Sequence, residues 1–181
     1  MADINVSPAL RRGPPSSGAG DAGARDPAFD LIELLFFAYR DFVADPDHVL
    51  ERLNFGRAHH RVLHFVNRHP GIRVADLLDI LKITKQSLGR VLRELIEQGY
   101  VDQSEGRADR RQRLLTATDK GRALALELAR LQTERFAKAL ASSGTTRDAA
   151  MRFLFAMIDG EQREEVTRLI AKADRAVRRD R

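Results

Sequence analysis

The sequence predicts a mainly helical protein with one small β-hairpin, and three observations lead to this prediction. Most apolar residues recur at spacings of three and four, which is typical of amphipathic helices. Aromatic residues make up only 6% of the chain, which suits a helical core built on Leu, Ala and Val. Two short segments with an extended pattern, residues 100–103 and 112–117, enclose a loop that contains Gly106 and indicate the hairpin.

The composition restricts the class of protein. The chain has 181 residues, enough for one domain or for a small domain with an oligomerisation region, and it contains no Cys for disulfide or thiol chemistry. Lys and Arg number 31 against 26 Asp and Glu, and the net charge of +5 favours a polyanionic partner. The richest apolar run is interrupted by Glu33, Arg40 and Asp41, so we expect neither a signal peptide nor a membrane span, and a cytoplasmic protein.

The first helix is expected to serve association as well as folding. Asp26 and Pro27 are typical of a helix start, and we expect this helix to end near Val43, before a turn at residues 45–47. Its apolar stripe, like that of residues 151–158, is wider than one chain can cover. The sequence therefore predicts an obligate homodimer.

Three shorter helices are expected over residues 56–68, 74–81 and 85–98. Thr84 is the expected N-cap of the third, and Gly99 lies just past its end, where a left-handed residue is needed. The last two of these helices, joined by a tight turn, form a helix-turn-helix pattern, and the hairpin after them has the position of a wing.

Two long helices are expected to complete the chain. Thr118 is the expected N-cap of the first, which runs to about residue 141. Thr145 or Thr146 opens the second, and Gly160 is expected to bend it.

Three short motifs follow one another in this region. They are Leu95-Ile96-Glu97-Gln98-Gly99-Tyr100-Val101, Asp109-Arg110-Arg111 and Ala117-Thr118-Asp119-Lys120-Gly121. In order and spacing they resemble the MarR family of bacterial winged helix-turn-helix regulators, in which Leu is usual at the position of Ala117. The segment 55–60 also resembles the PetP-type branch of that family. The resemblance implies a winged helix-turn-helix lobe with a small β-hairpin wing and a helical dimerisation base.

The pattern and the resemblance together predict five segments. They are a disordered tail (1–26), a first dimerisation helix (27–52), a winged helix-turn-helix DNA-binding lobe (53–117), long C-terminal dimerisation helices (118–176) and a basic tail (177–181). The expected function is transcription regulation by a homodimer on a pseudo-palindromic operator in double-stranded DNA, as a repressor rather than an activator. The alternatives are an adaptor that kept the fold without operator binding, and RNA binding, which would need more exposed aromatic residues than Tyr100 near the basic face.

The third of the shorter helices has one polar face. If Leu88, Val91, Leu92 and Leu95 face the core, the opposite face carries Lys85, Gln86, Gly89, Arg90 and Arg93. Gln pairs well with adenine and Arg with guanine in the major groove, so Gln86 and Arg90 are the candidates for base reading. The resemblance adds Ser87 and again Arg90 as DNA contacts. Gly89 stands where the family more often has Ser or Thr, either for close approach to DNA or by drift.

Four arginines cluster in and beside the predicted wing. They are Arg107, Arg110, Arg111 and Arg113. An Arg side chain is long enough to enter a narrow minor groove, whose potential attracts it. The resemblance assigns this insertion to Arg111 and implies that Asp109 pairs with an arginine to hold the wing, with a plain turn residue as the alternative for Asp109.

Other residues suggest a ligand cleft, and a metal or catalytic site is not expected. In the family, the helices that carry Phe36, Tyr39, Arg40, Phe55 and His59 line a cleft, which here can hold a small aromatic or anionic effector with Arg40 as counter-charge. Core packing is the alternative for these aromatic residues. His60 and His64 share a helical face, but no Cys or acidic residue accompanies them, so we expect no metal and no cofactor. The sequence has no phosphate loop, nucleophile elbow or paired catalytic carboxylates, and an enzyme is not expected.

Overall fold

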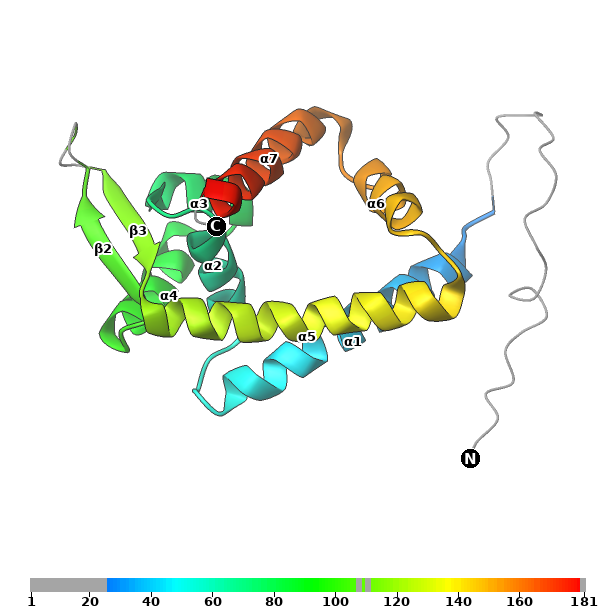
Figure 1. The fold of residues 1–181 in the computed structure, drawn as a ribbon, viewed down its shortest axis with the longest axis horizontal. Helices are drawn as coiled ribbons and strands as arrows, with labels where there is room; N and C mark the ends of the chain where they lie inside the picture. The colour runs from blue at the N-terminus through cyan, green and yellow to red at the C-terminus, as the bar shows by residue number, and fades with distance from the viewer. Residues whose placement is uncertain (1–25, 107–108, 110–111, 180–181) are drawn as a thin grey trace. The chain divides into compact units, whose positions relative to one another are not determined.

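The computed structural model describes residues 26–106, 109 and 112–179 (Figure 1). Nearly all of the predicted N-terminal tail, and Arg107, Arg110 and Arg111 of the wing, lie outside the described residues. The helices and strands are α1 (Phe29–Glu51), α2 (Arg57–Arg68), β1 (Ile72–Arg73), α3 (Val74–Leu81), α4 (Lys85–Glu97), β2 (Val101–Glu105), β3 (Arg113–Ala117), α5 (Asp119–Ser143), α6 (Arg147–Ala156), the 3-10 helix η2 (Gly160–Gln162) and α7 (Arg163–Arg179). The predicted class, mainly helical with a small sheet, is confirmed.

The chain divides into two units, residues 1–35 and 36–181, and the second contains the lobe. The core of the lobe combines α2, α3 and α4 with the sheet. Val62, Leu77 and Leu115 come from three of these elements, and each is 0% exposed. Burying a side chain of this size contributes roughly 1.5–3 kcal/mol, so this shared core fixes α4 against the other elements.

The sheet has one strand more than the sequence predicted. Its order is β1-β3-β2, and both pairings are antiparallel. In β1, Ile72 lies opposite Leu115, and the Gly71 N–H donates to the Leu115 carbonyl at 2.8 Å. Two residues directly after a Pro-Gly pair are too few to show an alternating pattern, so only the tertiary pairing reveals this strand. At the other end, β2 extends two residues beyond the predicted Gln103 to Glu105.

The predicted turn at residues 45–47 is wrong, because α1 continues through Pro46 to Glu51. A proline inside a helix removes a hydrogen bond and costs about 3 kcal/mol. Packing offsets this cost, since Pro46 itself is buried and the additional turn places Leu50 in the core at 1% exposure. The Leu50 carbonyl also accepts the Phe55 N–H at 2.9 Å, which directs the chain into α2.

The helix-turn-helix and the capping residues are confirmed. The Thr84 hydroxyl accepts the Ser87 N–H at 3.1 Å, and Gly99 has the expected left-handed conformation with φ of +73°. At the start of α5, the Thr118 hydroxyl accepts the Gly121 N–H at 3.0 Å. Capping depends on residues that are close in sequence, which is why these helix ends could be predicted.

The single bent helix predicted at the C-terminus is wrong, because α6 ends at Ala156 and α7 begins after η2. The side chain of Arg163 donates to the carbonyls of Ala156 at 2.8 Å and Ile158 at 2.9 Å. Asp159 caps η2 by accepting a backbone N–H at 3.0 Å. These contacts satisfy carbonyls at and just after the end of α6, so the helix ends before the predicted glycine instead of bending there. Among the helices within residues 26–179, none has the length and apolar character needed to cross a membrane.

Candidate nucleic-acid interface

Helix α4 buries one face and exposes the other. Leu88, Val91, Leu92 and Leu95 are at most 5% exposed and pack into the core of the lobe. The six residues predicted to contact DNA, Lys85, Gln86, Ser87, Gly89, Arg90 and Arg93, are all exposed on this helix. The structure therefore brings these six residues together on one element that is fixed from behind by its apolar face.

Contacts at both ends of α4 limit its movement. At the N-terminus, Thr84 accepts the Ser87 N–H and also donates its hydroxyl hydrogen to the Ser87 Oγ at 2.9 Å. At the C-terminus, the ammonium of Lys120 donates to the Gln98 carbonyl at 2.8 Å, and its Nζ lies 4.1 Å from the centre of the Tyr100 ring. A cation beside terminal carbonyls also interacts favourably with the helix dipole.

A hollow with a volume of about 500 Å³ lies between α4 and the sheet. Its lining includes the apolar residues Leu92 and Ile96, the cationic residues Lys85, Arg93 and Arg113, and the acidic residue Glu97. Gly89 also lines it, and a Cβ atom at this position would meet no atom within 4 Å. Nothing in the described chain therefore requires glycine at position 89.

The described part of the wing is held by charge pairing and by two backbone hydrogen bonds at the base of its loop. Glu105 and Arg113 lie opposite each other in β2 and β3, and their side chains form an ion pair of 3.0 Å. Arg113 is thus paired with a carboxylate within the wing. The Gly106 N–H donates to the Gln112 carbonyl at 2.9 Å, and the Gln112 N–H donates to the Asp109 carbonyl at 3.0 Å.

The close approach of the backbone at Asp109 explains why glycine stands at position 106. A Cβ atom there would lie 2.8 Å from the Asp109 carbonyl oxygen. The roles of Gly106 and Glu105 were not predicted from the sequence, although a carboxylate and an arginine at matching ends of two strands are a recognisable signal. Asp109 is exposed at the tip of the described wing, and its predicted ion pair with an arginine stays a prediction.

Two of the predicted cleft residues, Phe55 and His59, lie within the lobe. Phe55 is 5% exposed, and its ring stacks on the His59 ring with a centroid distance of 4.6 Å. His59 also contacts α4, because its Nε2 lies 2.6 Å from the Glu94 Oε2. The sequence analysis did not find this contact, since the two residues are 35 positions apart and belong to different helices.

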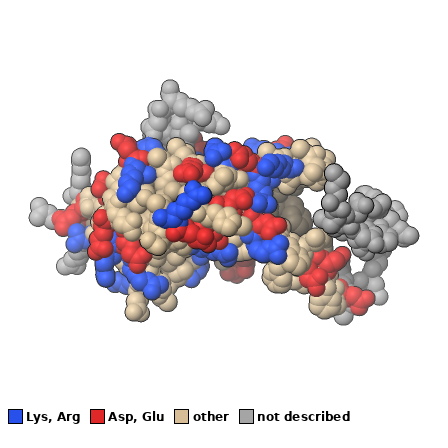
Figure 2. All heavy atoms as spheres, turned by 90° about the horizontal axis from the view of Figure 1, so that it is seen from below, with Lys and Arg blue, Asp and Glu red and all other residues tan. Residues whose placement is uncertain are grey.

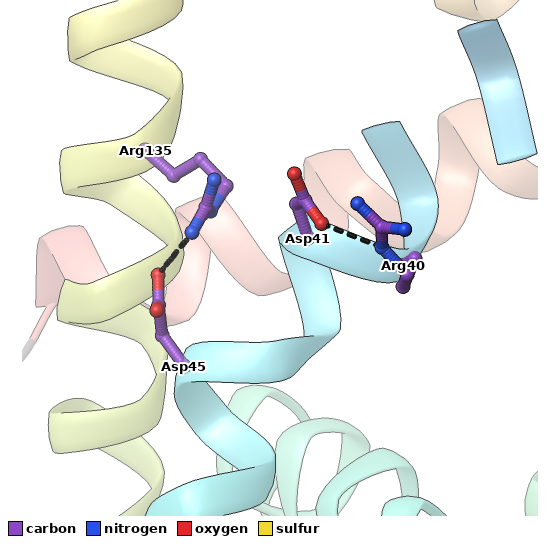
Figure 3. Close-up of polar contacts among 4 residues, drawn as sticks. All are labelled: Arg40, Asp41, Asp45 and Arg135. Carbon is purple, nitrogen blue, oxygen red and sulfur yellow. Dashed lines mark hydrogen bonds and ion pairs between the residues drawn. The ribbon is translucent and has the colours of Figure 1, made fainter. Parts of the chain in front are cut away.

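The other three predicted cleft residues lie on α1 and are exposed. The guanidinium of Arg40 donates to the Asp41 carboxylate at 2.8 Å (Figure 3) and lies 4.9 Å from the centre of the Phe37 ring. The hydrogen bond from Arg40 lowers the pKa of the Asp41 carboxyl group. Arg40 is therefore already paired with an anion. The exposed rings of Phe36 and Tyr39 belong to the same helix.

A pocket of about 320 Å³ lies where α1, α2 and α5 meet, and of the predicted cleft residues only Tyr39 lines it. The remaining lining residues are Phe42, Val43, Arg57, His60, Arg61, His64, Phe65 and Gln132. Burial lowers the pKa of His60, although the carboxylate of Asp47 opposes this effect. Within the described ranges, no group of three or more His, Asp or Glu residues is arranged to hold a metal ion.

Basic and acidic side chains are interspersed on the face of the molecule drawn in Figure 2. This face therefore has no extended patch of a single sign.

Sequence comparisons identify relatives of this helix-turn-helix protein. A family described as the MarR family matches residues 53–112. The HTH-type transcriptional regulator PetP from Rhodobacter capsulatus is 48% identical to this chain over 133 residues, which is 73% of this chain and 80% of that protein. This relative agrees with the resemblance of residues 55–60 to the PetP-type branch.

Solved structures share the fold. A MarR family transcriptional regulator from Listeria monocytogenes, crystallised with a 26-mer DNA, is 23% identical with a TM-score of 0.60, covering 83% of this chain and 91% of that chain. A mutant MarR from E. coli, crystallised with operator DNA, is 20% identical with a TM-score of 0.54, covering 73% of this chain and 96% of that chain. These two likenesses show the fold, and the identity with PetP shows the family. The chain therefore belongs to the MarR family of HTH-type transcriptional regulators, which are DNA-binding proteins and not enzymes.

Proposed function

We propose that this regulator binds a pseudo-palindromic operator as a homodimer and represses transcription by occupying it. The observation that carries the proposal is the exposed face of α4, where Gln86, Arg90 and Arg93 extend from a helix whose other face is buried. A helix presented in this way fits the major groove, and residues in its first turns reach base edges. Repression is the favoured mode because occupancy alone can block transcription. We also place the protein in the cytoplasm, which holds bacterial chromosomal DNA.

Exposed apolar side chains support the homodimer. In the second unit they include Phe36 and Phe37 on α1, Phe153 and Leu154 on α6, and Met157 directly after α6, which are between 47% and 67% exposed. Several such residues on two helices indicate an interaction surface, whereas single exposed apolar residues are common. In a dimer, two copies of α4 would contact half-sites about one helical turn, roughly 10 bp, apart. Light scattering at micromolar concentration tests this proposal, and a well-folded monomer would contradict both the dimer and the half-site spacing.

Base reading by Arg90 can be tested on an operator selected from random DNA by the parent protein. Arg90→Ala should weaken binding to this operator by about 1–3 kcal/mol and binding to random DNA much less, because a base contact is lost. Fluorescence anisotropy on both DNAs measures the difference. Arg147→Ala, which removes an exposed arginine from α6, is the matched control and should bind like the parent.

Two other outcomes of this experiment would contradict either base reading by Arg90 or operator binding itself. If Arg90→Ala weakens binding to the operator and to random DNA equally, Arg90 contacts a phosphate and not a base. A parent protein that prefers no DNA sequence would contradict operator binding and favour the adaptor alternative.

We further propose that a small aromatic anion binds in the 320 Å³ pocket and releases the operator. Phe42, Val43 and Phe65 supply apolar walls for a ring, and Arg61 supplies a cation. Arg61 also donates to the Leu81 carbonyl at the end of α3 at 2.9 Å, so an anion that recruits its guanidinium would disturb the helix-turn-helix. Benzoate is a suitable probe. It should weaken operator binding by the parent and have little effect on Arg61→Met, and an equal effect on both proteins would contradict the proposal.

A further inference from the structure

His59 connects the beginning of α2 to the recognition helix α4. Its Nδ1 accepts the Gly56 backbone N–H at 3.1 Å, and its Nε2 lies 2.6 Å from the Glu94 Oε2. A neutral imidazole has one nitrogen that accepts and one that donates. Because Nδ1 accepts, the proton is on Nε2 and is donated to the Glu94 carboxylate. Both ring nitrogens are thus hydrogen-bonded, with His59 as the donor and Glu94 as the acceptor of the bond between them.

Packing holds the imidazole in this orientation. The side chain of His59 is only 11% exposed, and its ring lies almost parallel to the Phe55 ring, at an interplanar angle of 14°. The Phe55 ring in turn contacts the Tyr100 ring edge-to-face, at a centroid distance of 5.2 Å. Tyr100 follows the C-terminal end of α4 by three residues, so the Phe55–Tyr100 contact holds the segment after this helix and the His59–Glu94 hydrogen bond holds the helix itself.

Phe55, which stacks on His59, also contacts α1. The Phe55 N–H donates to the carbonyl of Leu50, which is 1% exposed at the end of α1. On the other side, Glu94 follows Arg93 and lies one helical turn beyond Arg90, both of which are exposed on the face proposed to bind DNA. His59 and Glu94 therefore connect buried α1 residues with the part of α4 that carries its arginines.

We infer that His59 and Glu94 are positioning residues for operator recognition, because their hydrogen bond fixes the orientation of α4 against α2. The inference rests on the proposed function, in which α4 reads the operator. It differs from the expectation based on charge alone. A carboxylate on a helix that faces phosphates repels them, so its removal should strengthen binding to any DNA. If Glu94 positions α4, its removal should weaken binding to the operator.

Three substitutions on α4 separate these two effects. Glu94→Ala removes both the charge and the hydrogen-bond acceptor, and Glu94→Gln removes the charge but keeps an acceptor oxygen for His59. Glu97→Ala is the matched control, because it removes an exposed carboxylate from the same helix, about one turn further along. All three proteins are tested at a temperature at which circular dichroism shows that they are folded.

We expect Glu94→Ala to lose roughly tenfold in operator affinity, the effect of one hydrogen bond to a charged group. Its affinity for random DNA should not fall. Glu94→Gln should restore operator affinity to the parental value or above, and Glu97→Ala should bind at least as tightly as the parent. In a double-mutant cycle, the losses of operator affinity caused by His59→Ala and by Glu94→Ala should be less than additive, because both substitutions break the same contact.

Parental or tighter operator binding by Glu94→Ala would overturn the inference, and so would an equal loss on operator and random DNA. The proposed function is judged separately by Arg90→Ala. If Arg90→Ala loses operator preference while Glu94→Ala binds like the parent, only the positioning role is wrong. A parent protein without operator preference would overturn both.

Discussion

Gly121→Ala should destabilise the protein strongly, because α5 begins in contact with the backbone that follows α4. A Cβ atom at position 121 would lie 1.9 Å from the Tyr100 carbonyl oxygen and 2.9 Å from its carbonyl carbon. Both are backbone atoms, so a change of side-chain rotamer cannot relieve the overlap. Restoring an ordinary contact of about 3.4 Å requires that the start of α5 move away by roughly 1.5 Å.

Such a movement breaks the hydrogen bonds that join α5 to the end of α4. The Thr118 N–H donates to the Tyr100 carbonyl at 3.1 Å, the Thr118 hydroxyl to the Gly99 carbonyl at 2.7 Å, and the Lys120 ammonium to the Gln98 carbonyl at 2.8 Å. Their loss costs about 1 kcal/mol each, and overpacking adds about 1–3 kcal/mol. The better helix propensity of alanine returns about 1 kcal/mol, which leaves a net loss of roughly 3–5 kcal/mol.

Urea unfolding followed by far-ultraviolet circular dichroism measures this loss. Both proteins must be compared at one protomer concentration, because association contributes to the apparent stability of a dimer. Gly160→Ala is the control, since a Cβ atom there meets nothing within 4 Å, and it should change stability by less than about 1 kcal/mol. A loss of less than about 1 kcal/mol for Gly121→Ala would refute the reasoning, because it would mean that α5 can move at little cost.

Three further predictions follow from the hollow, the wing and a buried histidine. Gly89→Ala should stabilise the free protein by up to about 1 kcal/mol in thermal unfolding, because a Cβ atom meets nothing there; a lower midpoint would contradict this. In salt titrations on one operator, Arg111→Ala should weaken binding and flatten the salt dependence by about one charge per wing. Asp109→Ala should also weaken binding if this carboxylate holds the wing, and equal or tighter binding would assign the wing's role to its arginines alone. Burial, followed by nearby cations, lowers the pKa of His69 below 6.5, so His69 is neutral in the folded protein and is protonated more readily in the unfolded chain. Its contribution to stability is therefore present above about pH 6.5 and is lost as the pH falls, and His69→Asn should show a smaller drop in unfolding midpoint between pH 7 and 5 than the parent.

The predictions that succeeded depend on short sequence separations. Thr84, Gly99 and Thr118 end or begin helices through contacts with residues one to three positions away, and the structure places all three as expected. The exposed face of α4 follows in the same way from the spacing of four apolar residues. At Pro46 the local signal indicated a turn, but the burial of Leu50 outweighed it, and burial depends on the whole lobe.

The contacts that the sequence did not reveal cross between elements. The Arg113–Glu105 pair needs the register of the hairpin, and the His59–Glu94 pair needs the packing of α2 against α4. For the ligand cleft, Tyr39 is the one predicted residue that lines the pocket between α1, α2 and α5, and the cleft itself stays a prediction. Which faces of two helices meet is decided by their packing, and a single sequence does not contain that information in a local form.

Pro46 has a consequence for how the lobe can be presented to DNA. The residue before it, Asp45, is tied to α5 by the ion pair with Arg135 at 2.8 Å (Figure 3), and four residues after it Leu50 is anchored in the core of the lobe. Pro46 supplies no N–H for the helix between these two anchors, and a helix bends most easily where a hydrogen bond is missing. A tilt of the lobe would therefore bend α1 at this position, while the helical turns on either side stay intact. In a dimer, such a tilt would adjust the distance between the two recognition helices to the spacing of the half-sites.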